Sequence, residues 1–155
     1  MSIIEDQLLD KPPQGLPVSM HQDYAYWRFS SSMETVSCWI SLMEDVVNCG
    51  GLTIVSGSHR FGLATKPEKL IEGSEEQWLS VPASIRSSSE GELELVEIDV
   101  PKGGGVFFHG LTVHGSPRNP SRITRRGPEC IRHTRWRPRP DNFMNPACAG
   151  KWIDP

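Results

Sequence analysis

The sequence predicts an all-β, mainly antiparallel fold built as a sandwich or barrel. Short apolar segments recur along the chain between Gly and Pro residues, a spacing typical of antiparallel all-β domains. The 155 residues include 14 Gly and 13 Pro, which favours many turns and short elements over a helix bundle. A chain of this length is expected to enclose one hydrophobic core, so we predict a single domain over residues 1–155.

Each predicted strand is an apolar or alternating run bounded by turn-forming residues. In chain order, the predicted strands are Ile3–Leu9, Val18–Phe29, Thr35–Met43, Leu52–Val55, Leu93–Val100, Gly105–His109 and Ile131–Trp136. Residues 68–90 are polar with little apolar periodicity, and we expect a surface insertion there with room for one short helix. The proline-rich residues 138–155 predict an irregular C-terminal tail.

The composition favours a small-molecule partner. A formal net charge of -3 gives no electrostatic reason to expect nucleic acid or an anionic membrane. No apolar run approaches the roughly 20 residues of a membrane span, and Met1–Asp10 lacks the features of a signal peptide, so a soluble, cytoplasmic protein is expected. The four cysteines form no C-x-x-C pair and are expected to be reduced thiols.

A metal site is suggested first by His21 and Asp23, which lie two residues apart in the predicted strand over residues 18–29. Side chains at positions i and i+2 of a strand share a face, so the imidazole and the carboxylate can converge on one point. A His and an Asp at this spacing are common by chance, and the pair alone also fits an ordinary surface.

His114 strengthens the interpretation, since it follows the apolar run Gly105–His109 after a short turn. It lies 93 residues beyond His21, and only a closed or folded-back sheet would bring the two together. Two imidazoles and one carboxylate on one face of a metal leave three coordination positions open, as in non-haem iron(II) oxygenases. Catalytic zinc also accepts two His and one acid and is the main alternative.

Arg125, eleven residues after His114, is a candidate anchor for a carboxylate. Its guanidinium is permanently charged and offers a planar fork to the dicarboxylate co-substrate of such an oxygenase. The adjacent Arg126 is an alternative anchor. Either residue could instead be a solvated charge in a basic stretch that also contains Arg118, Arg122, Arg132, Arg135 and Arg137.

Taken together, the residues resemble the phytanoyl-CoA dioxygenase family of iron(II)- and 2-oxoglutarate-dependent oxygenases. The resemblance lies in several blocks that follow the family's order and span nearly the whole chain. They are Lys11–Pro13, Pro17–Asp23, Val36–Ile40, Gly50–Arg60, Lys102–His109 and His114–Ser116. The family implies a double-stranded β-helix, a jelly-roll or cupin-like fold of two sheets closed around a metal at the open end.

The resemblance also implies roles for individual residues and a reaction. His21, Asp23 and His114 match the family's Fe(II) ligands. The co-substrate 2-oxoglutarate is expected to be held at its distal carboxylate by Arg125, with help from Ser116, and to pack against Trp39. Hydroxylation of a C–H bond of a small organic molecule with O2, releasing succinate and CO2, is the implied activity. Related halogenases carry a small residue where this chain has Asp23, so hydroxylation is favoured over halogenation.

Several other residues receive structural assignments. The family's Ser56–Arg60 segment is expected to form a Gly-centred turn, although His59 and Arg60 within it could orient a neighbouring loop. His109 and His133 fit no ligand position and are assigned supporting roles. The aromatic residues Tyr24, Tyr26 and Trp27 could line a substrate pocket or belong to the core.

The chain departs from the family at its start. Only twenty residues precede His21, where family members usually carry a substantial helical and strand region under the major sheet. An uncovered apolar face is therefore expected, which would fit a fragment, a divergent short form or a homodimer. Two other functions stay open: a catalytically silent binding or assembly module, and a cupin-like zinc or iron enzyme that needs no keto acid. The substrate is not encoded in a readable motif.

Overall fold

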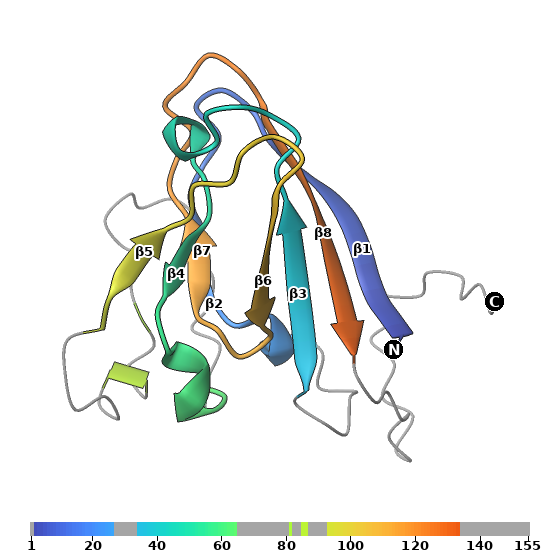
Figure 1. Cartoon of the computed structure of the whole chain (residues 1–155). Helices are drawn as coiled ribbons and strands as arrows, with labels where there is room; N and C mark the ends of the chain where they lie inside the picture. The colour runs from blue at the N-terminus through green and yellow to red at the C-terminus, as the bar shows by residue number, and fades with distance from the viewer. Residues whose placement is uncertain (1, 27–33, 65–80, 82–84, 87–92, 134–155) are drawn as a thin grey trace.

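The computed structural model describes residues 2–26, 34–64, 81, 85–86 and 93–133, and the account below concerns these residues. They form eight strands in two four-stranded antiparallel sheets (Figure 1). The major sheet has the order β1-β8-β3-β6 and the minor sheet the order β2-β7-β4-β5. Strands from the two ends of the chain therefore pair in nested fashion, the arrangement of a jelly roll, and the predicted all-β double-stranded β-helix is confirmed.

The elements have the following bounds. The major sheet contains β1 (Ser2–Lys11), β8 (Arg125–His133), β3 (Thr35–Ile40) and β6 (Gly105–His109). The minor sheet contains β2 (Val18–His21), β7 (His114–Ser116), β4 (Thr53–Val55) and β5 (Leu95–Glu97). Three short 3-10 helices connect strands: η1 (Asp23–Ala25), η2 (Val47–Cys49) and η3 (Ser58–Phe61).

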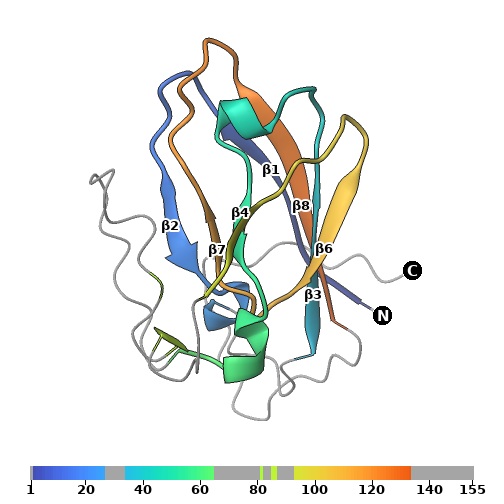
Figure 2. The ribbon, with the colours of Figure 1, turned by 60° about the vertical axis from the view of Figure 1, so that its left-hand side comes forward.

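The two sheets face each other, as Figure 2 shows from the side, and the main core lies between them. Strand β3 illustrates the alternation: Thr35, Ser37 and Trp39 are buried, whereas the residues between them are only half-buried. Trp39 and Phe108 pack in this core with Val46, Leu52 and Val100. A second cluster, of Met20, Val55, Ala64, Ile85 and Val113, includes residues of the minor sheet that face away from this interior.

The outer face of the major sheet carries large apolar side chains in contact with solvent. Phe107 is 73% exposed and Leu8 is 61% exposed. Phe107 pairs with Cys38 and Leu8 pairs with Pro128, which places both on the face opposite the core. Large apolar side chains are thus exposed on this face among the described residues, and the expectation of an uncovered apolar face stays a prediction.

Several predicted boundaries were wrong. The strand predicted over Val18–Phe29 ends at His21, and the chain then turns into η1, so Asp23 does not lie on a strand. Strand β8 begins at Arg125 and not at Ile131. Trp27, residues 138–155 and most of residues 68–90 lie outside the described residues.

Two smaller expectations can be compared with the structure. Cys49 is a buried free thiol, as expected from the absence of a C-x-x-C pair. Within the described ranges, the structure contains no helix long and apolar enough to cross a membrane.

Candidate active site

Three candidate ligands meet where β2 and β7 lie side by side. His21 ends β2, His114 begins β7, and the two are paired in register. Asp23 opens η1 immediately after β2. Its Oδ1 atom lies 3.5 Å from Nε2 of His21 and 3.2 Å from Nε2 of His114. One ligand atom from each residue lies within 4.8 Å of the others, so the structure brings the predicted triad together, through a turn in place of the expected strand.

Both imidazoles are oriented by their own backbone. Nδ1 of His21 lies 2.8 Å from the carbonyl oxygen of Ser19, and Nδ1 of His114 lies 2.9 Å from that of Thr112. A carbonyl oxygen only accepts hydrogen bonds, so each Nδ1 carries the proton and donates it. Each Nε2 therefore points toward Asp23, and this is the ring atom that a metal ion would meet.

Asp23 is held from the opposite sheet. The Ser37 hydroxyl, on β3, lies 2.5 Å from Oδ2 of Asp23 and donates to it. This contact leaves Oδ1 as the oxygen that faces the two histidines. Sequence reasoning missed Ser37, although its position two residues before Trp39 on β3 places both side chains on the inner face.

The charges of the triad are coupled. Burial alone would raise the pKa of Asp23, but the charge of His114 and hydrogen bonds from His114, His21 and Ser37 outweigh it, and the pKa is well below its usual range. Burial alone would lower the pKa of His114, but the Asp23 carboxylate raises it to about 9. In the metal-free protein, His114 is therefore protonated at neutral pH, and its positive charge balances the negative charge of Asp23.

The donor set fits a divalent metal ion. Two oriented Nε2 atoms and one carboxylate oxygen converge from one side, and the carboxylate is anchored by its second oxygen. This is the ligand chemistry of a facial two-histidine, one-carboxylate site, which suits non-haem iron(II) and on ligand type also suits zinc.

Arg125, at the start of β8, is also buried. It is 5% exposed, and its guanidinium carbon lies 5.5 Å from the centroid of the Trp39 ring. Burial lowers the pKa of Arg125, and the charges of Glu129 and Asp10 offset part of that effect. Nε of Arg125 and Nε1 of Trp39 are both buried without a hydrogen-bond partner among the described residues. Buried donors are usually hydrogen-bonded, so two donors without a partner in one interior indicate a binding site for a polar ligand.

The two candidate arginines lie on opposite faces of β8. The side chain of Arg126 is 62% exposed, and its Nε lies 3.6 Å from Oδ2 of Asp10 on the outer face of the major sheet. Arg126 therefore cannot reach the interior without a shift of strand register, whereas Arg125 already faces it.

Ser116 lies two residues after His114 on β7, on the same inner face, and is 4% exposed. Its hydroxyl oxygen accepts a hydrogen bond from Nζ of Lys11, at 2.6 Å. Sequence reasoning noted Lys11 only as part of the Lys11–Pro13 block and gave it no role. Burial and the neighbouring Arg125 lower the pKa of this lysine to about 7.

The Ser56–Arg60 segment forms the expected turn, with Gly57 at a φ of 72°. Ser58 within it donates to the carbonyl of Val55, and its hydroxyl oxygen accepts a bond from the backbone N–H of Val113, at 2.8 Å. The turn thus supports the residue next to His114.

The other aromatic and histidine candidates have different surroundings. His59 stacks on His109, with ring centroids 5.7 Å apart. Tyr24 is buried, whereas Tyr26 is half exposed and makes an edge contact with His21. The side chain of His133 lies outside the described residues.

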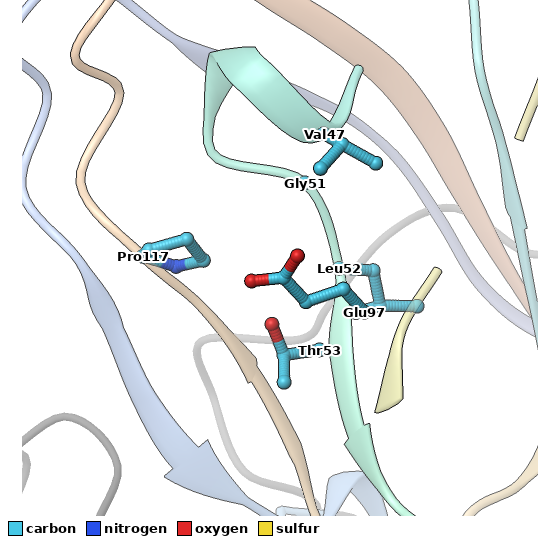
Figure 3. Close-up of a pocket in the computed structure, with 6 residues that line it drawn as sticks. All are labelled: Val47, Gly51, Leu52, Thr53, Glu97 and Pro117. Carbon is cyan, nitrogen blue, oxygen red and sulfur yellow. The ribbon is translucent and has the colours of Figure 1, made fainter. Parts of the chain in front are cut away.

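A small pocket lies apart from these residues. Figure 3 shows its lining residues, which include the Glu97 carboxylate and the Thr53 hydroxyl. Thr53 pairs with Gly115, next to the Ile54–His114 pair, so its side chain lies on the opposite face of the minor sheet from His114. The lining residues are Val47, Gly51, Leu52, Thr53, Glu97 and Pro117, and none of the candidate site residues is among them.

Comparison with known proteins points to one family. The model of a family described as "Phytanoyl-CoA dioxygenase (PhyH)" matches residues 1–127. "Phytanoyl-CoA dioxygenase, peroxisomal" of Bos taurus is 31% identical over 127 residues, which cover 79% of this chain and 36% of that protein. The chain therefore spans little more than a third of this relative's length.

Solved structures share the fold. The non-heme alpha ketoglutarate dependent epimerase SnoN from nogalamycin biosynthesis superposes with a TM-score of 0.63 at 21% identity, covering 88% of this chain and 49% of that chain. EctD from S. alaskensis, solved with 2-oxoglutarate and 5-hydroxyectoine, gives a TM-score of 0.61 at 22% identity, covering 84% and 43%. Because the family model matches residues 1–127 of the 155, the chain belongs to the phytanoyl-CoA dioxygenase family.

Proposed function

We propose that this chain is an Fe(II)- and 2-oxoglutarate-dependent dioxygenase domain that hydroxylates a C–H bond of a small organic molecule. The observation that carries the proposal is the convergence of His21, Asp23 and His114 at one end of an interior that also holds the buried Arg125. A metal site alone would fit many enzymes. The added buried cation favours a reaction that needs an anionic co-substrate.

His21, Asp23 and His114 would hold the metal through Nε2, Oδ1 and Nε2. Bound iron(II) supplies the binding and reduction of dioxygen, chemistry that no side chain provides. The chain contributes fixed ligand positions: backbone carbonyls orient the imidazoles, and Ser37 anchors the carboxylate. Because Asp23 fills a coordination position, hydroxylation is favoured over halogenation.

Arg125, Trp39 and Ser116 would position 2-oxoglutarate. The partnerless Nε of Arg125 can donate to the distal carboxylate, and the Trp39 indole provides a flat surface and a second donor beside it. Two related structures support this class of ligand: SnoN was solved with Fe3+ and alpha ketoglutarate, and EctD with 2-oxoglutarate.

In the proposed reaction, 2-oxoglutarate loses CO2 and takes one oxygen atom of O2 to become succinate. The other oxygen atom enters the substrate, converting C–H to C–OH. Buried surroundings at Asp23 and His114, each 4% exposed, limit the access of bulk water to this end of the interior. The chain spans about a third of the relatives' length, so the identity of the substrate is a matter for direct screening.

The test is anaerobic addition of iron(II) and 2-oxoglutarate to the purified chain. We expect a weak visible charge-transfer band from chelation of the keto acid, which bleaches when oxygen is admitted while succinate accumulates. His114→Ala should abolish iron binding and the band, whereas the exposed His59→Ala should retain both.

The outcomes separate the alternatives. Iron binding without the band would instead indicate a catalytically silent binding module. Tight zinc binding with no effect of 2-oxoglutarate would support a cupin-like enzyme of another class. Once a substrate is found, incorporation of one atom of 18O2 into its alcohol product would establish hydroxylation.

A further inference from the structure

We propose that Lys11 is a positioning residue for the co-substrate, which fixes the Ser116 hydroxyl as a hydrogen-bond donor and adds a second positive charge beside Arg125. The inference rests on the proposed binding of 2-oxoglutarate and deepens it, because it assigns a residue to the far carboxylate that sequence reasoning had left without a role.

The contacts of Lys11 determine whether the Ser116 hydroxyl donates or accepts a hydrogen bond. Nζ of Lys11 lies 2.6 Å from Oγ of Ser116, 2.5 Å from the carbonyl oxygen of Pro117 and 3.3 Å from that of Ser116. When Lys11 is protonated, its ammonium group only donates, so in that state Oγ of Ser116 is an acceptor in this contact. The hydroxyl proton must then be donated elsewhere, and no acceptor for it is found among the described residues. A carboxylate in the interior would supply that acceptor.

The two cations lie close together on the same face. Lys11 and Arg125 are partners in register at the ends of β1 and β8, and they are 4% and 5% exposed. Two buried like charges repel each other, and repulsion by Arg125 contributes to the low pKa of Lys11. The charges of Glu129 and Asp10 raise the pKa of Arg125, but its burial lowers that pKa by more. An anionic ligand in contact with both Arg125 and Ser116 would relieve the repulsion.

The backbone of Lys11 is held firmly in place. Nδ2 of Asn119, a residue with no exposed surface, donates to the carbonyl oxygens of Lys11 and Pro12 at 3.0 and 3.1 Å. The same amide nitrogen lies 2.8 Å from the carbonyl oxygen of Ile123. The end of β1, which carries Lys11, is thereby tied to the segment that leads into Arg125, so the two cations are presented as one preorganised unit.

A comparison of two keto acids tests the role. We would measure the affinity of iron-loaded protein, without oxygen, for 2-oxoglutarate and for 2-oxobutyrate, which lacks the distal carboxylate. Lys11→Met should weaken 2-oxoglutarate binding by about 10- to 100-fold. It should leave 2-oxobutyrate binding unchanged. Lys102→Met, at an exposed lysine, should alter neither affinity.

A double-mutant cycle tests whether Lys11 acts through Ser116. If it does, Ser116→Ala and Lys11→Met should weaken 2-oxoglutarate binding non-additively, and the double variant should bind about as poorly as the weaker single variant. Lys11→Arg keeps the charge and should bind 2-oxoglutarate more tightly than Lys11→Met. It also provides a folded variant if the methionine variant unfolds.

The outcomes distinguish this inference from the function on which it rests. If wild-type protein binds iron but not 2-oxoglutarate, both are overturned. If wild-type protein binds 2-oxoglutarate and Lys11→Met binds it equally well, only the role of Lys11 is overturned. Equal loss of affinity for both keto acids would likewise overturn it, because it would indicate general damage to the site.

Discussion

The Ser37 hydroxyl lies 2.5 Å from Oδ2 of Asp23 and joins β3 of the major sheet to a carboxylate that follows the minor sheet. Ser37 has no exposed surface, so water cannot replace it as a donor without rearrangement. The two sheets are therefore linked at the proposed metal site by a charge-assisted hydrogen bond.

Ser37→Ala should consequently weaken metal binding without abolishing it. Loss of a partner that orients a ligand typically costs about 10- to 100-fold in metal affinity, and we expect a change in that range. Iron(II) or cobalt(II) titration measures it, with Ser56→Ala as a control at an exposed serine. Unchanged affinity in Ser37→Ala would mean that Asp23 is positioned by its backbone alone.

The pH dependence of the metal-free protein should reflect the Asp23–His114 pair. The pKa of His114 is raised from 6.5 to about 9, so its stabilising contribution is complete below pH 6.5 and is lost as the pH rises through 9. In the presence of a chelator, the melting temperature of the wild type should exceed that of His114→Gln most at about pH 6. The difference should shrink through pH 9. A difference that is constant with pH would contradict the charged pair.

Much of the fold and site could be predicted because the signals are local. Alternation of apolar residues and Gly- or Pro-bounded runs indicate strands, and His21 and Asp23 lie two residues apart in the sequence. The strand predicted at Gly105–His109 has the bounds seen in the structure. Pairing of distant strands then places the two histidines side by side.

The missed features depend on register and long-range contacts. Gly127 and Pro128 disfavour a strand, so the start of β8 at Arg125 was not foreseen. They are tolerated because this part of β8 pairs with β1 alone, since the pairing with β3 runs only from Glu129 to His133. The register of β8 from this point decides whether Arg125 or Arg126 faces the interior. The Lys11–Ser116 contact joins residues 105 positions apart, and no periodicity encodes it.

Gly127 should be required for the position of Trp39. A Cβ atom at Gly127 would lie 2.6 Å from Cζ2 of Trp39 and 2.7 Å from the carbonyl oxygen of Ile40. Gly127→Ala should therefore displace the indole, lower the free energy of unfolding by about 1–3 kcal/mol and weaken 2-oxoglutarate binding. Gly105→Ala is a matched control because its Cβ would lie 3.3 Å from the nearest atom, the carbonyl oxygen of Trp39. Chemical denaturation and tryptophan fluorescence measure both effects, and equal behaviour of the two variants would contradict the argument.

Truncation of Phe108 should destabilise the protein much more than truncation of Phe107, since adjacent residues of β6 point to opposite faces of the major sheet. Phe108 is 8% exposed, belongs to the main core, and its ring centroid lies 4.7 Å from that of His114. Phe108→Ala should lower the free energy of unfolding by about 3–5 kcal/mol and weaken metal binding. Phe107 is 73% exposed, so Phe107→Ala should change the free energy of unfolding by less than about 0.5 kcal/mol. Urea denaturation at several protein concentrations measures the free energy of unfolding of both variants.

A large, concentration-dependent loss of stability in Phe107→Ala would contradict this prediction. It would show that the outer face is covered by another copy of the chain in solution.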